Sequence, residues 1–276
     1  ASQYNLGLVT YFEAIALAQA GLIETFTPAE IPNLAQMRPE YLPRNAQDRA
    51  LGVPVYYTFY GIAYNRELAR AEDFSSWRNL SDAKWRGKLS VTRPVYAAPY
   101  DLVIMSKAMG GDERNIQPGI PLLRSVVENS LTTYSSLAHM NTLLTRNEVA
   151  AVPYYASRVW SLQRQGVNQV DIVMPREGIL AQPYVLVAPK NLRNRDATLR
   201  FLDYVAGAEP QGRAAAMDGW LPTNARAPSS PEFERIIRIP YAELTSKLYM
   251  PDWRVIVETN EERVNMVEQL MAAVRR

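Results

Sequence analysis

The sequence has 276 residues, of which 47% are hydrophobic and 21% charged, and its formal net charge is +2. This balance is typical of a globular chain of one or two domains, and it excludes the strong basic field of a nucleic-acid-binding protein. The chain has no cysteine and one histidine, His139. Disulfides, thiol nucleophiles and Cys/His zinc sites are therefore excluded, and a Ser-His-Asp arrangement would depend on His139, which lies in an apolar helical pattern.

No run reaches the roughly 20 apolar residues that a membrane-spanning helix needs. The start of the sequence lacks the basic and apolar regions of a signal peptide. We therefore expect a soluble chain without membrane insertion, present as a mature or trimmed form with its signal peptide removed.

The first predicted elements are a strand and a helix. Residues 4–9 form an apolar run typical of a buried strand, and Thr10 is a candidate N-cap for a helix over residues 11–20. Such a strand-to-helix turn is a common ligand site in α/β proteins. Prolines break residues 22–48 into loops and short helical turns.

Two β-rich stretches divide the chain. Val53–Asn65, VPVYYTFYGIAYN, has nine apolar or aromatic residues in thirteen, and Gly61 predicts that it forms two short strands with a break between them. Residues 178–189, GILAQPYVLVAP, form the second stretch. We interpret the pair as crossings between two α/β lobes, with the functional cleft between them.

Helices and strands alternate along the rest of the chain. Strands are predicted over residues 88–92, 149–153 and 170–174, and helices over residues 100–109, 120–128, 137–145, 154–165, 197–207, 210–217 and 255–274. This alternation predicts a mostly parallel sheet covered on both faces.

Seven segments in this order carry a resemblance: VPVYYTFYGIAYN, WRNLSDAKWRGKLSV, MGGDERN, VAAVPYYASRVW, MPREGIL, GWLPTN and PDWRVI. Together they resemble the periplasmic solute-binding proteins of ABC importers, in the spermidine/putrescine-binding group. The resemblance implies a two-lobed type II periplasmic-binding-protein fold that closes around a small polar solute by hinge bending. It further implies no catalysis, no cofactor and no metal, a monomer in the periplasm or tethered outside the cytoplasmic membrane, and an ABC permease with its ATPase as partners.

The resemblance also predicts the lobe boundaries. Lobe one would comprise residues 1–56 and 185–231, lobe two residues 61–181 and 232–276, and the hinge residues 53–65 and 178–189. Members of the group carry about 50 more residues before the segment that looks like YNLGLVT. The resemblance therefore implies either a trimmed chain or a rebuilt, N-terminally incomplete lobe one.

Several site residues follow from the resemblance. Thr10 and Phe12 would face the cleft, although Thr10 could equally serve only as the helix cap. Tyr155 and Trp220 would stack on an amine or an alkyl chain, and Tyr60 would lie at the cleft floor.

The charged positions differ from those of polyamine binders. Tyr184 stands where the group places a key aspartate, and Arg254 stands at a neutral amide position, which points towards a solute with an anionic group. Asp101 and Glu13 could still neutralise one amine, as a zwitterion would require. Arg254 could equally be a surface residue at a helix start.

Two other functions remain open. Ferric-ion-binding relatives use a tyrosine pair, and Tyr154 and Tyr155 lie at a comparable place, without an obvious histidine or carboxylate companion. A hydrolase using two carboxylates would draw on Glu177 and Asp101, although nothing in their spacing shows a paired acid and base.

Overall fold

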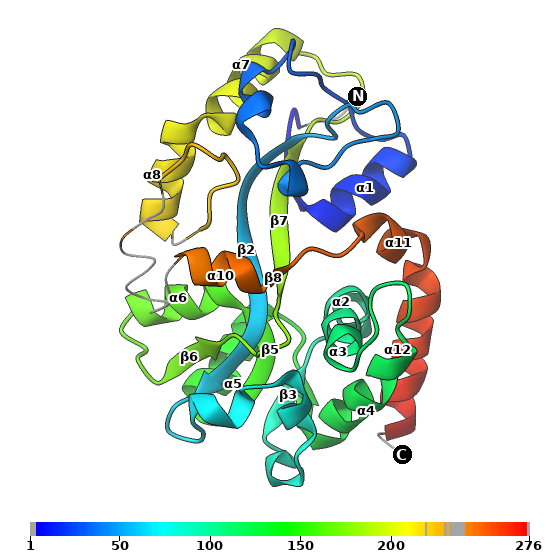
Figure 1. The fold of residues 1–276 in the computed structure, drawn as a ribbon, viewed down its shortest axis with the longest axis vertical. Coiled ribbons are helices and arrows are strands. Elements are labelled where there is room, and N and C mark those ends of the chain that lie inside the picture. The colour runs from blue at the N-terminus through cyan, green and yellow to red at the C-terminus, as the bar shows by residue number, and fades with distance from the viewer. Residues whose placement is uncertain (1–3, 219, 229–230, 232–240, 275–276) are drawn as a thin grey trace. The chain divides into compact units, whose positions relative to one another are not determined.

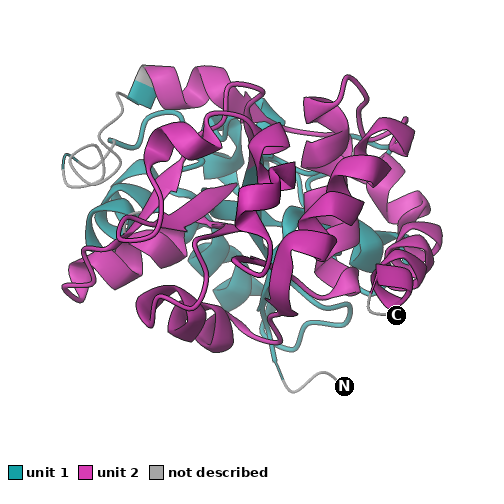
Figure 2. Ribbon diagram, turned by 90° about the horizontal axis from the view of Figure 1, so that it is seen from below, with its two compact units in different colours: residues 1–58, 181–241 teal, residues 59–180, 242–276 magenta. Residues whose placement is uncertain are grey.

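The computed structural model describes residues 4–218, 220–228, 231 and 241–274. The chain divides into two compact units, which Figure 2 colours separately. The first unit comprises residues 1–58 and 181–241, and the second comprises residues 59–180 and 242–276. Gly219 of the GWLPTN segment and residues 232–240, at the start of the second part of the predicted lobe two, lie outside the described residues. The predicted lobe and hinge boundaries stay a prediction.

The first unit is built around β1 (Gly7–Thr10) and β7 (Ile179–Val187), which run antiparallel with Gly7 opposite Val187 and Thr10 opposite Tyr184. Its helices are α1 (Tyr11–Gln19), α7 (Arg195–Ala206) and α8 (Ala208–Asp218), and its short 3₁₀ turns are Pro32–Gln36 and Pro39–Tyr41. Each 3₁₀ turn starts at a proline, whose fixed φ favours the first helical position. Phe26, Val53 and Leu202 are fully buried members of its core.

The second unit contains most of the other strands (Figure 1). These are the later part of β2 (Val53–Asn65), β3 (Leu89–Val91), β4 (Ser130–Thr133), β5 (Ala151–Tyr155), β6 (Val170–Val173) and β8 (Leu248–Tyr249). β2 runs antiparallel to β5 and to β6, β3 runs parallel to β4 and to β5, and the start of β7 runs parallel to β8.

Helices surround these strands. They are α2 (Pro94–Tyr96), α3 (Leu102–Ala108), α4 (Ile120–Asn129), α5 (Leu137–Thr145), α6 (Ala156–Arg164), α10 (Tyr241–Lys247, mostly in this unit), α11 (Trp253–Glu258) and α12 (Asn260–Val274). Helix α12 packs against α2 and α4, and buries Val267, Leu270 and Met271. No helix in the described ranges is long and apolar enough to cross a membrane.

The predicted break in β2 is wrong. Val53–Asn65 is one continuous strand, and Gly61 lies inside it, opposite Tyr154. A Cβ at Gly61 would lie 2.9 Å from the Val173 carbonyl oxygen of β6. The glycine therefore permits a close approach of two backbones and does not end a strand.

The predicted parallel character is also wrong, because the sheet is mixed. β2 runs antiparallel to β5 and β6, and β7 to β1, and the prediction missed β4 altogether. Alternating helices and strands indicate crossover connections, but they do not fix the direction of the two long strands that connect the units. The mixed α/β class itself is confirmed.

The last predicted helix is divided in two. Helix α11 ends at Glu258, and α12 begins at Asn260. The side chain of Thr259 lies between them, donating to the Val255 carbonyl at 2.7 Å and accepting from Arg263 Nε at 2.6 Å. Amphipathic spacing continues across this junction, so periodicity alone could not show it.

Candidate functional site

A turn of π-helix leads into α3 and carries two residues of the candidate site. Residues Ala97–Asp101 form this turn, with Pro99 inside it. Proline has no N–H to donate to an α-helical ladder, so the backbone widens around it, and turns of this kind are frequent at functional sites. The turn delivers Tyr100 and Asp101 to the interior of the second unit, where both are buried.

Asp101 is a fully buried carboxyl group. Its Oδ1 accepts a hydrogen bond from the Tyr60 hydroxyl at 2.7 Å, while its Oδ2 has no hydrogen-bond partner among the described residues. Burial raises the pKa of Asp101 to about 7, and the bond from Tyr60 acts in the opposite direction. Burial, together with the neighbouring charge of Asp101, also raises the pKa of Tyr60. Near neutral pH the carboxyl group is therefore close to its titration point, and one of its oxygens lacks a donor.

Aromatic rings from separate elements pack against Tyr60, the hydrogen-bond partner of this carboxyl group, and against one another. The ring centroid of Tyr60 lies 5.0 Å from that of Tyr155 and 5.9 Å from that of Tyr100. The centroids of Tyr100 and Tyr155 are 6.4 Å apart. Trp253 of α11 meets Tyr100 edge-on, at 6.1 Å and 79°. We call Asp101 with these four rings the Asp101 site.

Strand register explains why the rings of the Asp101 site meet. Tyr60 of β2 lies directly opposite Tyr155 of β5, and cross-strand neighbours of this kind are in contact. Tyr155 is half-buried, whereas Tyr60, Tyr100 and Trp253 are buried. The structure thus brings together Tyr60, Asp101 and Tyr155 of the predicted site, and adds Tyr100 and Trp253, which the sequence analysis did not select.

The chemistry of the Asp101 site suits a cation. A buried carboxylate without a partner is costly, and a bound positive charge would neutralise it. Ring faces attract cations through their quadrupoles. No group of three or more histidine, aspartate or glutamate side chains in the described part of the chain is arranged to hold a metal ion.

The first unit carries a second aromatic feature. The ring of Tyr56 stacks on that of Tyr184 at 4.8 Å and 24°, and on that of Trp220 at 3.9 Å and 12°. All three side chains are half-buried. We call these three rings the aromatic column; it joins the predicted residues Tyr184 and Trp220 through Tyr56, which the sequence analysis missed because Val53–Asn65 is rich in tyrosine throughout.

Backbone bonds and a buried glutamine hold the segment that carries Trp220. Leu221 and Tyr57 exchange two backbone hydrogen bonds, of 2.8 and 3.0 Å. The side chain of Gln211, on α8, accepts from the backbone N–H groups of Thr223 and Asn224 at 2.9 and 2.8 Å. The position of Trp220 therefore depends on bonds of its neighbours to β2 and to α8.

Thr10 lies at the end of β1, opposite Tyr184. Its hydroxyl accepts from the Glu13 N–H at 3.2 Å, and its own N–H donates to Glu13 Oε2 at 2.8 Å, completing a capping box at the start of α1. The predicted cap is confirmed, and the Glu13 carboxylate is engaged in it. Phe12 is half-buried in the first turn of α1.

Arg254 follows Trp253 in the first turn of α11 and is exposed. Its backbone N–H donates to Asp252 Oδ1 at 3.2 Å, which caps the helix. The arginine is thus next in sequence to Trp253 of the Asp101 site, and a role in binding stays a prediction.

Tyr154 and Glu177, which ferric binding and carboxylate catalysis would use, form hydrogen bonds within the chain. The Tyr154 hydroxyl lies 2.9 Å from Asn141 Oδ1 and 3.2 Å from the Leu137 carbonyl, and burial raises the pKa of Tyr154, which opposes the phenolate that ferric iron needs. Glu177 accepts bonds from the Ser76 hydroxyl and the Trp77 N–H. Neither arrangement supports ferric binding or carboxylate catalysis.

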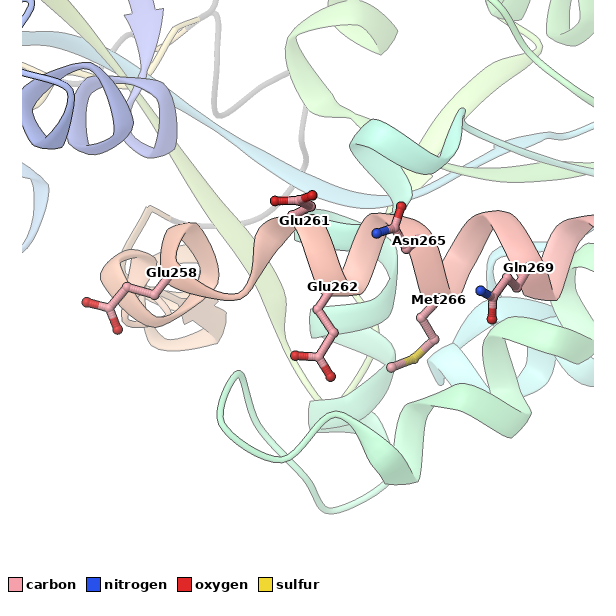
Figure 3. Close-up of a pocket in the computed structure, with 6 residues that line it drawn as sticks. All are labelled: Glu258, Glu261, Glu262, Asn265, Met266 and Gln269. Carbon is pink, nitrogen blue, oxygen red and sulfur yellow. The ribbon is translucent and has the colours of Figure 1, made fainter.

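A surface hollow of about 610 Å³ lies along α11 and α12 (Figure 3). Its lining residues are Glu258, Glu261, Glu262, Asn265, Met266 and Gln269. In Figure 3, Glu258, Glu262 and Met266 project to one side of the helices. Polar residues at such spacing are typical of the solvent-facing side of an amphipathic helix, and we assign this hollow no ligand.

The fold is that of known solute-binding proteins. The spermidine/putrescine ABC transporter substrate-binding protein of Streptococcus pneumoniae aligns over 100% of this chain and 85% of its own, with a TM-score of 0.78 at 15% identity. A GABA receptor aligns over 98% and 82%, with a TM-score of 0.77 at 18% identity. Ferric iron-binding protein A of Mannheimia haemolytica aligns over 98% and 83%, with a TM-score of 0.74 at 13% identity. At these identities the likeness shows the fold alone.

The family follows from the sequence match. The model of the bacterial extracellular solute-binding protein family matches residues 5–239, and the chain belongs to this family, which is one of receptors and not of enzymes. The spermidine/putrescine-binding periplasmic proteins of Escherichia coli and Haemophilus influenzae are 19% and 18% identical, over 83% and 76% of this chain. The chain spans 66% and 59% of the length of these two relatives. The predicted resemblance and fold are thereby confirmed.

Proposed function

We propose that this chain is a periplasmic, monomeric solute receptor that binds a small molecule with an ammonium group and delivers it to an ABC permease and its ATPase. The solute is polyamine-like, amino-acid-like or zwitterionic, and no reaction is catalysed. Membership of the solute-binding family and the spermidine/putrescine-binding relatives support the receptor role. The Asp101 site supports the ammonium group. Contact between the solute and the aromatic column, in the same predicted cleft, stays a prediction.

One observation carries this proposal: the buried carboxyl group of Asp101, whose Oδ2 has no hydrogen-bond partner among the described residues. A charge held in such surroundings needs a counter-charge. Among the described residues, this carboxyl group accepts a hydrogen bond from a neutral donor, the Tyr60 hydroxyl. An ammonium group would supply both the missing charge and a donor.

Calorimetric titration tests the proposal, with putrescine, spermidine and GABA as the first probes. At least one should bind, and at a hundred times its Kd it should raise the free energy of unfolding by about 2.7 kcal/mol. Asp101→Asn keeps an acceptor for Tyr60 but removes the charge, so it should weaken binding about 10- to 100-fold, the effect of losing a charge-assisted hydrogen bond.

Asp196→Asn provides the matched control, because Asp196 is an exposed residue in the first turn of α7. This variant should bind like the parent chain. The proposal fails if amines, amino acids, phosphonates and iron all leave the melting temperature unchanged, or if chromogenic esters or glycosides are turned over.

A further inference from the structure

We infer that Tyr134 is a positioning residue of the Asp101 site, which fixes the direction in which the Tyr60 hydroxyl donates. The inference rests on the proposed function and adds a further residue to its site. Three observations carry it: the strand ends that deliver Tyr134 and its neighbour Thr92, the burial of both side chains, and a series of hydroxyl groups that ends at the carboxyl group.

Two adjacent strand ends deliver Tyr134 and Thr92 to the same part of the interior. Val91, the last residue of β3, pairs in parallel with Thr133, the last residue of β4. The Tyr134 N–H extends this ladder by donating to the Val91 carbonyl at 3.0 Å. Tyr134 and Thr92, each one residue further on, therefore leave the sheet at neighbouring points, and both are buried.

The side chain of Tyr134 reaches a strand that is not its neighbour. In the sheet, β3 and β5 separate β4 from β2, the strand that carries Tyr60. Burial and the nearby charge of Asp101 raise the pKa of Tyr134, whereas hydrogen bonding acts in the opposite direction. The partners in this hydrogen bonding are the side chains of Thr92 and Tyr60. The ring of Tyr134 also meets that of Tyr154 on β5 edge-on, at 6.0 Å and 89°.

The donors of these groups form an ordered series. A hydroxyl group has one proton to donate and two lone pairs with which to accept. Tyr60 uses its proton for Asp101 Oδ1, at 2.7 Å, so its oxygen is the acceptor towards Tyr134. Tyr134 uses its own proton for Tyr60 and can accept that of Thr92. Hydrogen bonds aligned in this way polarise one another, so the series should stabilise the charged carboxylate that a cationic solute needs.

Carbon-13 NMR titration of the aspartate carboxyl groups in the unliganded protein tests the inference, with Asp101→Asn to assign the signal. Tyr134→Phe should raise the midpoint of the Asp101 titration by about 0.5 pH unit, because the bond from Tyr60 becomes weaker. Thr92→Val should shift the midpoint in the same direction, whereas Thr92→Ser, which retains the hydroxyl group, should keep the parental midpoint. Tyr154→Phe is the matched control: it removes another buried hydroxyl group, which is bonded instead to Asn141, and should leave the midpoint unchanged.

Calorimetry links this midpoint to binding, with whichever of putrescine, spermidine and GABA binds most tightly. At pH 6 Tyr134→Phe should weaken binding about threefold, since the carboxyl group then holds its proton more firmly. At pH 8.5 the affinities should agree, and in the Asp101→Asn background the substitution should have no effect at either pH.

Two results would overturn the inference and leave the proposed function standing. One is an Asp101 midpoint that neither Tyr134→Phe nor Thr92→Val moves. The other is an equal loss of affinity in Tyr134→Phe at both pH values, which would indicate a purely structural role. If none of the three amines binds the parent chain, the proposed function fails, and the role of Tyr134 in the site fails with it.

Discussion

Asp101 combines two properties that are seldom found together in a stable interior. It is ionisable, and its side chain is fully buried with one oxygen lacking a partner among the described residues. Burial raises its pKa to about 7, against about 3.9 in an unfolded chain. Between these values the folded state binds more protons than the unfolded state, so the contribution of this group to stability decreases as the pH rises through that window.

The unliganded protein should therefore lose stability between about pH 4 and pH 7, and Asp101→Asn should remove this loss. The free energy of unfolding of the variant, minus that of the parent chain, should increase by on the order of 1–4 kcal/mol from pH 5 to pH 8, because the pKa of Asp101 differs by about 3 between the folded and unfolded states. Urea unfolding at both pH values measures the difference. A constant difference between the two chains would show that Asp101 does not titrate in this range.

Affinity for a cationic solute should depend on pH in the opposite direction. Below about pH 7 the carboxyl group of the free protein takes up a proton, which a bound cation must displace. The Kd should rise about tenfold for each pH unit below that point, since one proton is exchanged. Calorimetry in buffers of different ionisation enthalpy would detect the released proton, and a flat profile from pH 5 to pH 8 would contradict the assignment of Asp101 to binding.

Among the elements, β2 shows that a glycine inside a strand pattern does not always mark the end of the strand. Gly61 lies in mid-strand because the β6 backbone passes close to it, at the Val173 carbonyl. In a sequence, a glycine inside a strand pattern indicates a break in the strand and a close approach of another backbone equally well. Only the pairing of Ile62 with both Pro153 and Val173 decides between them, because it shows that the strand has neighbours on both sides at this point.

Gly61→Ala should accordingly destabilise the chain by about 1–3 kcal/mol, because the new Cβ must push two strands apart. Gly7→Ala is the matched control: in β1 the added Cβ would lie 3.9 Å from Val187 Cγ2, an ordinary contact. Denaturant unfolding of both variants tests this, and equal stabilities would contradict the close-approach interpretation.

At the scale of the molecule, the second unit is assembled from two distant stretches of chain, 59–180 and 242–276. The second stretch contributes Trp253 to the Asp101 site, and its last helix, α12, packs against the π-helical turn that carries Asp101. Folding of this unit therefore depends on residues at the far end of the sequence.

Leu270→Ala in α12 should lower the free energy of unfolding by about 2–5 kcal/mol, the usual cost of truncating a buried leucine. Gln269→Ala, on the exposed side of the same helix, should change it by less than about 0.5 kcal/mol. Thermal unfolding followed by circular dichroism distinguishes them. Similar melting temperatures would mean that α12 contributes little to the unit.

Much of the fold could be predicted from the sequence, because long periodic segments carry their own signal. Helix α5 was predicted with the bounds that the structure has, and Thr10 was correctly identified as the cap of α1. Strand direction and the four-residue β4 could not be predicted, since both depend on neighbours distant in sequence. In the site, the family resemblance drew attention to Tyr60 and Tyr155, whereas Tyr56, Tyr100 and Trp253 become apparent only through register and ring contacts.

The π-helical turn has a consequence for how specificity could change. Such a turn holds one residue more than an α-helical turn, so deletion of one residue from Ala97–Asp101 would restore regular helix and rotate the preceding side chains by about 100° about the axis relative to α3. The carboxyl group could be withdrawn from the rings without any change in the strands that carry Tyr60 and Tyr155. Under the proposed function, such a deletion should lower the affinity for cationic solutes. This turn is therefore a natural position for insertions and deletions when such receptors diverge or are engineered.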